Sequence, residues 1–250
     1  MNGGKILLVT GGSRGIGAAV AIGAARAGWK VAVNYRANAQ AAAKVVDVIG
    51  RGGGEAFAIE GDVGKELDIL AMFAAVDARW GRLDGLVNNA GIVGPKARVE
   101  EFSSERIETM LRINVTGSML CAREAVKRMS SRRGGQGGVI VNLSSVAAKL
   151  GSPNEYVDYA ASKAAIDAFT RGLGLEVADE GIRVMAVRPG IIDTEIHASG
   201  GQPDRIERVR GMVPMKREGR AEEVADLILY LLSDQASYMT ATHVDVGGGR

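Results

Sequence analysis

The sequence predicts an α/β fold: one doubly wound Rossmann-type domain over residues 1–250, with a seven-stranded parallel sheet flanked by helices. Three observations predict it. Short aliphatic or β-branched runs recur about every 25 to 30 residues, segments with helical spacing separate them, and glycines stand at their ends. Because each strand is followed by a helix, the connections are crossovers that cover both faces of a parallel sheet.

The predicted elements follow in order along the chain. The expected strands are the apolar runs at 5–10, 30–35, 55–60, 83–89, 138–144, 182–187 and 242–246. Helical spacing predicts helices at 15–28, 39–50, 67–80, 105–129, 156–178 and 221–233. One segment, at about 191–219, is too long for a plain connection and has no strand signal, so it is expected to be a partly helical flap.

Composition excludes several function classes. The 31 Lys and Arg against 29 Asp and Glu give a net charge of +2 without a basic cluster interleaved with aromatic residues, so no nucleic-acid partner is expected. Cys121 is the only cysteine and the two histidines, His197 and His243, lie far apart, which predicts no internal disulfide and no metal site. No leader pattern and no run of about 18 apolar residues occurs, which favours a cytoplasmic protein without a membrane partner.

The turn TGGSRGIG, residues 10–17, joins the first strand to the first helix. A glycine-rich turn here lets the backbone approach a pyrophosphate and presents the helix N-terminus to it. Such turns also serve as tight connections, so the turn alone is a weak signal. The candidate cofactor contacts in it are Gly11, Ser13, Arg14, Gly15, Ile16 and Gly17.

The end of the second strand, Asn34, Tyr35 and Arg36, bears on the choice of nucleotide. A dinucleotide fold that prefers NAD usually places a carboxylate there, whereas an arginine accommodates a 2′-phosphate. Arg36, assisted by Arg14, therefore favours NADP(H), with NAD(H) as the less favoured cofactor. The alternative is that Arg36 is a solvated charge at the end of a strand.

Two further strand ends add candidate cofactor contacts, Asp62 and Val63 in GDV and Asn88, Ala90 and Gly91 in NNAG. Both lie at the carboxyl edge of the expected sheet, where open α/β proteins bind ligands. Asp62 could instead cap the helix that follows.

Six motifs carry a resemblance to a known family: TGGSRGIG, NNAG, INV around Asn114, the serine after the fifth strand, YAASK at 159–163 and RPG at 188–190. In this order the sequence resembles the classical short-chain dehydrogenase/reductase family over essentially its whole length. The resemblance implies Tyr159 as acid/base, Lys163 as its pKa modifier and ribose contact, Ser145 as a second hydrogen bond to the substrate oxygen, and Asn114 as support for a relay water. It also implies a homotetramer and adds Pro189, Gly190, Ile192 and Thr194 as cofactor contacts.

The chemistry of YAASK agrees with this assignment. Residues four apart lie on one face of a helix, so Lys163 is expected beside Tyr159. A nearby ammonium stabilises tyrosinate, so Lys163 is predicted to lower the pKa of the Tyr159 phenol, which could then exchange a proton with a carbonyl oxygen as hydride is transferred.

The chain departs from the family pattern in two places. Ser145 and Tyr159 are 14 positions apart, one more than is most common in the family, which leaves Ser144 as an alternative to Ser145. Thr240 is followed by Ala241 where the family usually has glycine, with an effect expected on packing at most.

The predicted function is that of an NADP(H)-dependent oxidoreductase acting on a small carbonyl or CH–OH substrate, in the manner of a 3-oxoacyl thioester reductase. A sugar or polyol dehydrogenase similar to glucose dehydrogenase is the first alternative, and a non-catalytic nucleotide-binding protein is the second. Basic residues in the flap could guide an anionic substrate, but neighbouring glutamates favour a solvated surface. These basic residues are Arg205, Arg208, Arg210, Lys216 and Arg217.

Overall fold

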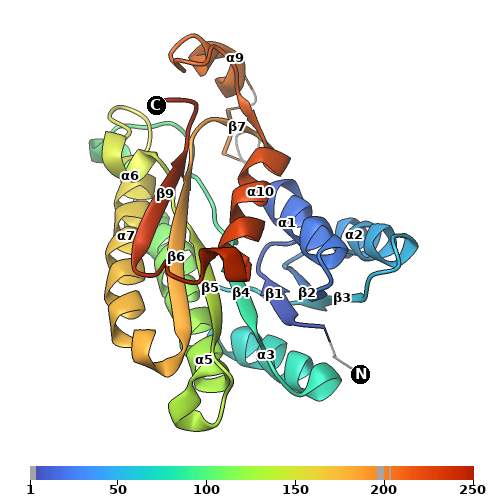
Figure 1. Cartoon of the computed structure of the whole chain (residues 1–250). Coiled ribbons are helices and arrows are strands. Elements are labelled where there is room, and N and C mark those ends of the chain that lie inside the picture. The colour runs from blue at the N-terminus through green and yellow to red at the C-terminus, as the bar shows by residue number, and fades with distance from the viewer. Residues whose placement is uncertain (1–3, 196–199, 203) are drawn as a thin grey trace.

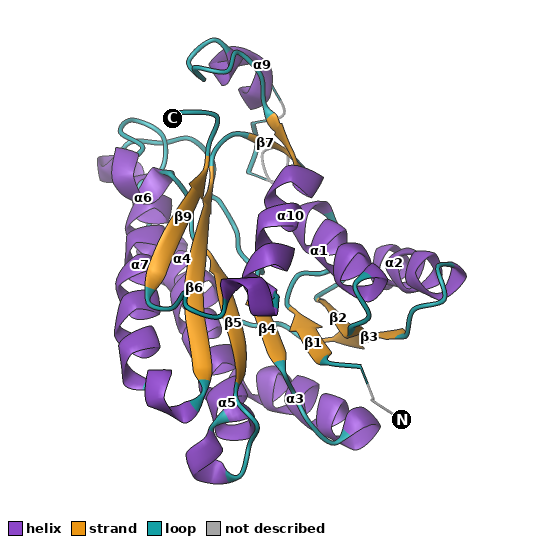
Figure 2. Ribbon diagram, viewed as in Figure 1, coloured by secondary structure: helices purple, strands orange, loops and turns teal. Residues whose placement is uncertain are grey.

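Seven parallel strands form the central sheet of the computed structural model, which describes residues 4–195, 200–202 and 204–250 (Figures 1 and 2). The strands are β1 (Ile6–Val9), β2 (Lys30–Tyr35), β3 (Ala56–Glu60), β4 (Gly85–Asn88), β5 (Gly138–Leu143), β6 (Ile182–Pro189) and β9 (Thr242–Val246). Their order is β3-β2-β1-β4-β5-β6-β9, so the predicted doubly wound, seven-stranded sheet is confirmed. The winding direction reverses between β1 and β4, and a crevice opens there at the carboxyl ends of the strands.

Helices cover both faces of the sheet (Figure 2). In β1, Leu7 and Val9 pack in one core with α1 (Gly15–Arg26), α2 (Ala39–Arg51) and α10 (Ala221–Leu232), while Ile6 and Leu8 pack in the other. The second core includes residues of α3 (Glu66–Trp80) and α5 (Ser118–Met129), and partly buried residues of α7 (Val157–Glu176) pack against it. Burial on both faces explains why the central strands read as continuous apolar runs.

Short helices complete the framework. They are α4 (Ser104–Leu111), α6 (Ala147–Leu150) and the 3-10 turns Val99–Glu101, Ser131–Arg133, Ala178–Glu180 and Asp234–Ala236. In the described part of the chain, every helix is too short or too polar to cross a bilayer.

The helix predicted at 105–129 is interrupted. A π turn at Arg112–Gly117 separates α4 from α5. A π turn holds one residue more than an α turn, and such bulges occur frequently at functional sites. Apolar periodicity does not reveal a single extra residue, so the sequence predicted one continuous helix.

The segment predicted as a flap contains α9 (Arg205–Arg210), which confirms its partly helical character. The expectation of no strand was wrong, because β7 (Ile192–Asp193) pairs with β8 (Gly219–Arg220). Two-residue strands are too short to show alternation. Figure 1 shows α9 and β7 beyond the carboxyl ends of β6 and β9, while residues 196–199 and 203, including His197, lie outside the described residues. Movement of the segment as a flap stays a prediction.

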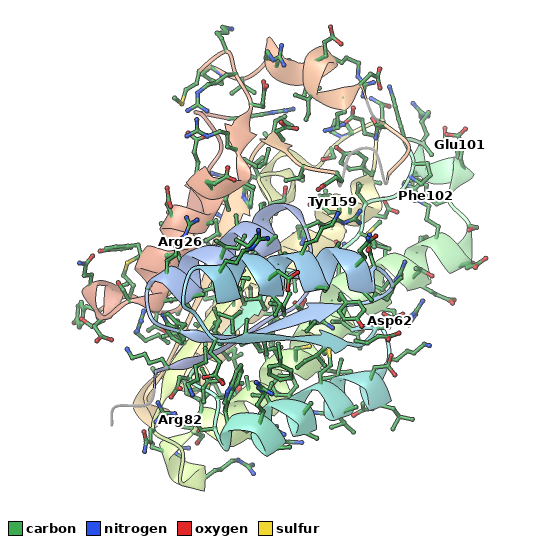
Figure 3. The ribbon with its side chains drawn as sticks, turned by 90° about the vertical axis from the view of Figure 1, so that its right-hand side faces the viewer. Arg26, Asp62, Arg82, Glu101, Phe102 and Tyr159 are labelled. Atoms are coloured by element: carbon green, nitrogen blue, oxygen red, sulfur yellow. The ribbon has the colours of Figure 1, made fainter. Side chains whose placement is uncertain are left out.

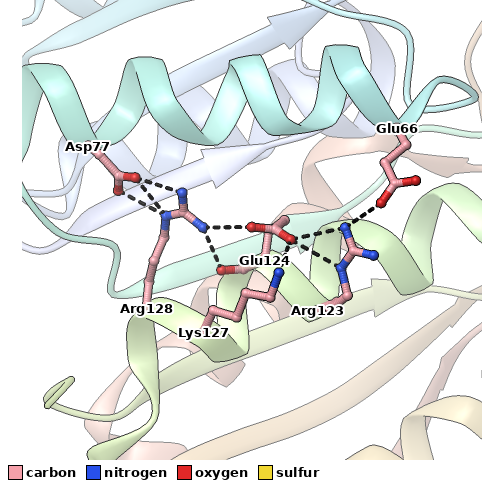
Figure 4. Close-up of polar contacts among 6 residues, drawn as sticks. All are labelled: Glu66, Asp77, Arg123, Glu124, Lys127 and Arg128. Carbon is pink, nitrogen blue, oxygen red and sulfur yellow. Dashed lines mark hydrogen bonds and ion pairs between the residues drawn. The ribbon is translucent and has the colours of Figure 1, made fainter. Parts of the chain in front are cut away.

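An ionic network joins α5 to α3 (Figure 4). Glu124, whose side chain is only 5% exposed, accepts hydrogen bonds from Lys127 Nζ at 2.7 Å and Arg128 Nη1 at 3.1 Å. Arg128 Nη2 also donates to Asp77 Oδ2 on α3 at 2.6 Å. The network therefore joins α5 to α3, which lie side by side.

Candidate active site

A cavity of about 390 Å³ lies at the carboxyl ends of β1 to β4, at the reversal of strand order. It contains most of the residues predicted to bind the cofactor. Those lining it are Gly11, Ser13, Arg14, Gly15, Ile16, Asn34, Tyr35, Arg36, Asp62, Val63, Ala90, Gly91 and Thr194. Contact of each with a cofactor stays a prediction.

The turn before α1 has the geometry that its glycines permit. Gly11 and Gly15 have φ of +61° and +51°, which side-chain-bearing residues rarely adopt. A Cβ on Gly17 would lie 2.4 Å from the carbonyl oxygen of Gly11, although Gly17 itself does not line the cavity. No side chain caps the start of α1 and its first turn has no acidic residue, which suits a bound phosphate.

The asparagines at the strand ends divide between structural and cavity-lining roles. Asn34 Oδ1 accepts from Gly11 N at 3.0 Å, and Asn34 Nδ2 donates to the Gly61 carbonyl at 2.9 Å, so this amide holds the turn against the end of β3. Asn88, a predicted cofactor contact, is buried and donates to Asn142 Oδ1 at 2.9 Å. Its side chain therefore points into the protein and not into the cavity.

Asn89, which was not among the predicted cofactor contacts, lines the cavity, and Asn88 does not. Asn89 Nδ2 donates to the carbonyls of Thr10 and Gly11, both at 2.9 Å. The signal was present in the sequence, because successive residues at a strand end point to opposite sides and only one of the two asparagines can face the crevice.

Asp62 lies at the same end of the sheet as Tyr159, while Arg82 lies at the other end (Figure 3). Asp62 Oδ1 accepts from Gly64 N at 2.8 Å, and the Asp62 carbonyl accepts from Lys65 N at 2.9 Å. The N-cap position of α3 is Lys65, and no side chain makes a capping hydrogen bond there. The Asp62 side chain therefore closes its own turn and does not cap the helix.

A second cavity, of about 130 Å³, adjoins the first and shares Ile16, Asn89, Gly91 and Thr194 with it. Three of the four predicted catalytic residues, Ser145, Tyr159 and Lys163, line this cavity. The predicted cofactor contacts after β6, namely Pro189, Gly190 and Ile192, also line it.

Ser145 is the serine that faces Tyr159. Its Oγ accepts from the backbone N–H of Ala147 at 3.1 Å, which leaves its hydroxyl hydrogen to donate to the phenol oxygen of Tyr159. Ser144 Oγ instead donates to the carbonyl of Lys163 at 3.1 Å. The structure therefore favours Ser145 over Ser144 as the residue beside a substrate oxygen.

The proton affinities differ from the expectation for YAASK. Burial raises the pKa of the Tyr159 phenol, and the Ser145 hydrogen bond and the charge of Arg205 only partly offset it. The predicted lowering of this pKa by Lys163 is therefore wrong for this structure. Lys163 Nζ lies 5.6 Å from the centroid of the Tyr159 ring and donates to the Leu143 carbonyl at 2.7 Å, and its charge is not among the causes of the shift of the Tyr159 pKa.

Lys163 also titrates abnormally. Burial lowers the pKa of the Lys163 ammonium from 10.5 to about 8, against the opposing effect of Asp167. Near neutral pH the site therefore holds a protonated phenol beside an ammonium that is close to its titration point. This state suits proton donation to a carbonyl oxygen.

Asn114 lies in the π turn, beneath the second cavity. Its Oδ1 accepts from Ile92 N at 2.8 Å, and its Nδ2 donates to the Ile92 carbonyl at 2.9 Å and to Ser162 Oγ at 3.1 Å. A Cβ on Gly91 would lie 3.2 Å from Asn114 Oδ1 and 3.6 Å from Lys163 Nζ. The amide thus fixes the loop after β4 to α7, and support for a relay water stays a prediction.

Comparisons with known proteins agree with this arrangement. The family model described as enoyl-(acyl carrier protein) reductase matches residues 11–250. The uncharacterized oxidoreductase YgfF of Escherichia coli is 56% identical over 98% of this chain and 99% of its own length. Glucose 1-dehydrogenase 2 of Bacillus subtilis is 37% identical, over 98% of this chain and 94% of its own.

A solved structure repeats the fold. A short-chain type dehydrogenase/reductase from Mycobacterium marinum superposes with a TM-score of 0.92 at 36% identity, covering 98% of this chain and 95% of the other. With the seven-stranded sheet and the Ser145, Tyr159 and Lys163 cluster, these matches place the chain in the classical short-chain dehydrogenase/reductase family, as an oxidoreductase.

Proposed function

We propose that the protein is an NADP(H)-dependent oxidoreductase that interconverts a carbonyl compound and its alcohol. The turn before α1 fits a dinucleotide, because Gly11 and Gly15 line the larger cavity and no side chain caps the start of α1. When bound, the nicotinamide would supply or accept the hydride.

The observation that carries the choice of NADP(H) is the pair Arg14 and Arg36. Both side chains are exposed and line the larger cavity. Within the described ranges neither guanidinium forms an ion pair, and no carboxylate stands at the end of β2. A 2′-phosphate is the group that two free guanidinium groups would bind.

The proposed roles of the catalytic residues follow from their positions. Tyr159 Oη donates the proton to the carbonyl oxygen as negative charge develops on it, and Ser145 Oγ donates a second hydrogen bond to the same atom. Lys163, held by the Leu143 carbonyl, lies where the two cavities meet at Gly91 and is proposed to contact the ribose.

Replacing Arg36 tests the cofactor choice. Arg36→Asp should lower kcat/KM with NADPH by about ten- to a hundredfold more than with NADH, since a charge-assisted contact contributes roughly 1.5–3 kcal/mol. Lys44→Asp, an exposed position on α2 outside the cavity, makes the same change of net charge and serves as the control. Equal losses with both cofactors in Arg36→Asp would remove the basis of the proposal.

The substrate is proposed to be a small carbonyl compound, as for a 3-oxoacyl thioester reductase. The relative named glucose 1-dehydrogenase 2 favours a sugar or polyol dehydrogenase as the second candidate. A panel of 3-oxoacyl thioesters, aldoses and small ketones separates the two. Tight NADPH binding without reduction of any carbonyl compound would favour the third candidate function, that of a nucleotide-binding protein without catalytic activity.

The proposal extends to location and assembly. The family resemblance supports a cytoplasmic homotetramer that acts on a small molecule and needs no nucleic acid, membrane or metal. Light scattering that returns the 26.1 kDa mass of one chain would contradict the tetramer.

A further inference from the structure

The smaller cavity has an uneven distribution of charge. Among the described residues that line it, three are cationic, Lys163, Arg205 and Arg250, and none is Asp or Glu. The remaining wall is mainly apolar and includes Val93, Leu150 and Ile191. Such a lining suits a substrate that has a short hydrocarbon body and a negative charge.

Arg205 differs from the other basic residues of its segment. Arg210 and Arg217 pair with Glu218 and Glu223 at the surface, with side chains 47% exposed. The Arg205 side chain is 6% exposed and lines the cavity. The expectation of a solvated surface therefore does not apply to Arg205.

The guanidinium of Arg205 is held in place but has an unused donor. Its Nη1 donates to Glu155 Oε2 at 2.6 Å, and its Cζ lies 4.8 Å from the ring centroid of Tyr156. Its Nε is buried and has no hydrogen-bond partner in the described structure. An unsatisfied buried donor on a charged group is costly, and an acceptor entering from the cavity would satisfy it.

Glu155 pairs with Arg205 from outside the cavity. It is absent from the cavity lining, and its Oε1 also lies 3.6 Å from Arg208 Nη2, while Arg208 Nη1 lies 3.4 Å from Asp204 Oδ2. Arg250 adds a second guanidinium to the cavity lining, and its charge acts on Tyr156. Among the described residues, the charged side chains that line the cavity itself are therefore all basic, which favours an anion inside it.

Arg205 is also connected to the proton donor. The ring of Tyr156 packs edge-on against that of Tyr159, with centroids 5.6 Å apart, and Arg205 stacks on the same Tyr156 ring. The cavity volume of about 130 Å³ is well below the roughly 300–1,000 Å³ of pockets for drug-sized ligands. A volume this small suits a short substrate between Tyr159 and Arg205.

We propose that Arg205 binds the carboxylate of a short oxo acid or hydroxy acid and thereby presents its carbonyl or hydroxyl group to Tyr159 and Ser145. This inference rests on the proposed function and specifies its substrate class. It makes Arg205 a specificity-determining residue supplied by α9.

Matched acids and esters test the inference. In NADPH-dependent reduction, the parent enzyme should prefer acetoacetate and 4-oxopentanoate to their methyl esters by about tenfold or more. Arg205→Gln should lower kcat/KM for the acids by about ten- to a hundredfold and for the esters by less than about threefold. Arg205→Lys should lie between, because it keeps the charge but loses Nε. Arg210→Gln, on the same helix and outside the cavity, should change neither.

A second variant addresses folding. Arg205→Gln leaves Glu155 with a weaker partner, so the double variant Arg205→Gln/Glu155→Gln removes the uncompensated carboxylate. The loss confined to acids should persist in the double variant. A parent that prefers esters, or equal losses on acids and esters in both variants, would overturn the carboxylate site.

Binding measurements separate this inference from the proposed function. If the parent binds NADPH but reduces no compound, the proposed function fails, and calorimetry then decides the carboxylate site. Acetoacetate that binds the parent, with or without NADPH, and not Arg205→Gln supports the site. Absence of acetoacetate binding to the parent refutes it.

Discussion

Ala241 has the backbone conformation of a glycine, and replacing it should stabilise the protein. Its φ is +54°, and its N–H donates to the Val184 carbonyl at 2.7 Å, which holds this conformation at the start of β9. The left-handed region costs a side-chain-bearing residue about 1–2 kcal/mol. The change proposed is Ala241→Gly.

The expected gain follows from three contributions. Glycine removes the strain of about 1–2 kcal/mol, but it loses about 0.5–1 kcal/mol more backbone entropy on folding. The half-buried methyl group of Ala241 contributes about 0.4 kcal/mol, half of the value for a buried methylene. At the midpoints of these ranges the free energy of unfolding should rise by about 0.4 kcal/mol, or about 1 °C in Tm for a chain of this size.

The assay is guanidinium unfolding at fixed protein concentration. Ala97, a half-buried loop residue outside the positive-φ set, provides the control. Ala97→Gly should destabilise by about 0.5–1 kcal/mol, so the two substitutions should have opposite signs. A destabilisation of Ala241→Gly equal to that of Ala97→Gly would refute the strain argument.

Three other predictions concern α7 and α5. Lys163→Met should be more stable than the parent at pH 7.5 and should lose about 2–3 kcal/mol of that advantage by pH 10.5. The unfolded lysine keeps its proton up to about pH 10.5 and the folded one only up to about pH 8, so only the parent gains stability from this group as the pH rises. Denaturant titrations of both proteins at the two pH values measure this, and an unchanged difference in stability would contradict it. Glu124→Gln should lower the free energy of unfolding by about 1–3 kcal/mol at pH 7. Burial acts to raise the pKa of Glu124, but hydrogen bonds from Lys127 and Arg128 hold it below 4.5. The parent should therefore be the more stable protein above pH 4.5 and should lose this advantage as the pH falls through the folded pKa; an advantage unchanged down to pH 2 would contradict the network. Burial raises the pKa of Cys121 to about 12, so iodoacetamide at pH 8 should label this cysteine only after guanidinium is added. Mass spectrometry measures the labelling, and rapid labelling of the native protein would contradict the prediction.

The sequence predicted the seven strands because the central ones are buried on both faces and their apolar runs are continuous. It could not predict β7 and β8, whose two residues each show no period, or the extra residue at Arg112–Gly117. Most of the residues that line the two cavities were named from the expected strand ends and from the family resemblance, and their contacts with a ligand stay predictions. Which way each side chain points was not predicted, as the exchange of Asn88 for Asn89 shows.

The pKa of Tyr159 was the main error in the site. Helical spacing correctly placed Lys163 near the ring, but the direction of the ammonium depends on the Leu143 carbonyl, which comes from another strand. The family pattern did detect Ala241. The expectation of a packing effect was incomplete, because only the backbone angle reveals strain.

At the π turn the number of residues between α4 and α5 matters for the site. Loss of a single residue between Arg112 and Gly117 would turn the π turn into an ordinary α turn, which keeps α4 and α5 on one helix but removes the wider turn from which Asn114 contacts Ile92. A change of length that a surface turn absorbs would here displace Asn114, one of the proposed catalytic residues. Divergence in chain length among functional relatives should therefore accumulate in turns such as that before Tyr156, and not in this stretch of helix.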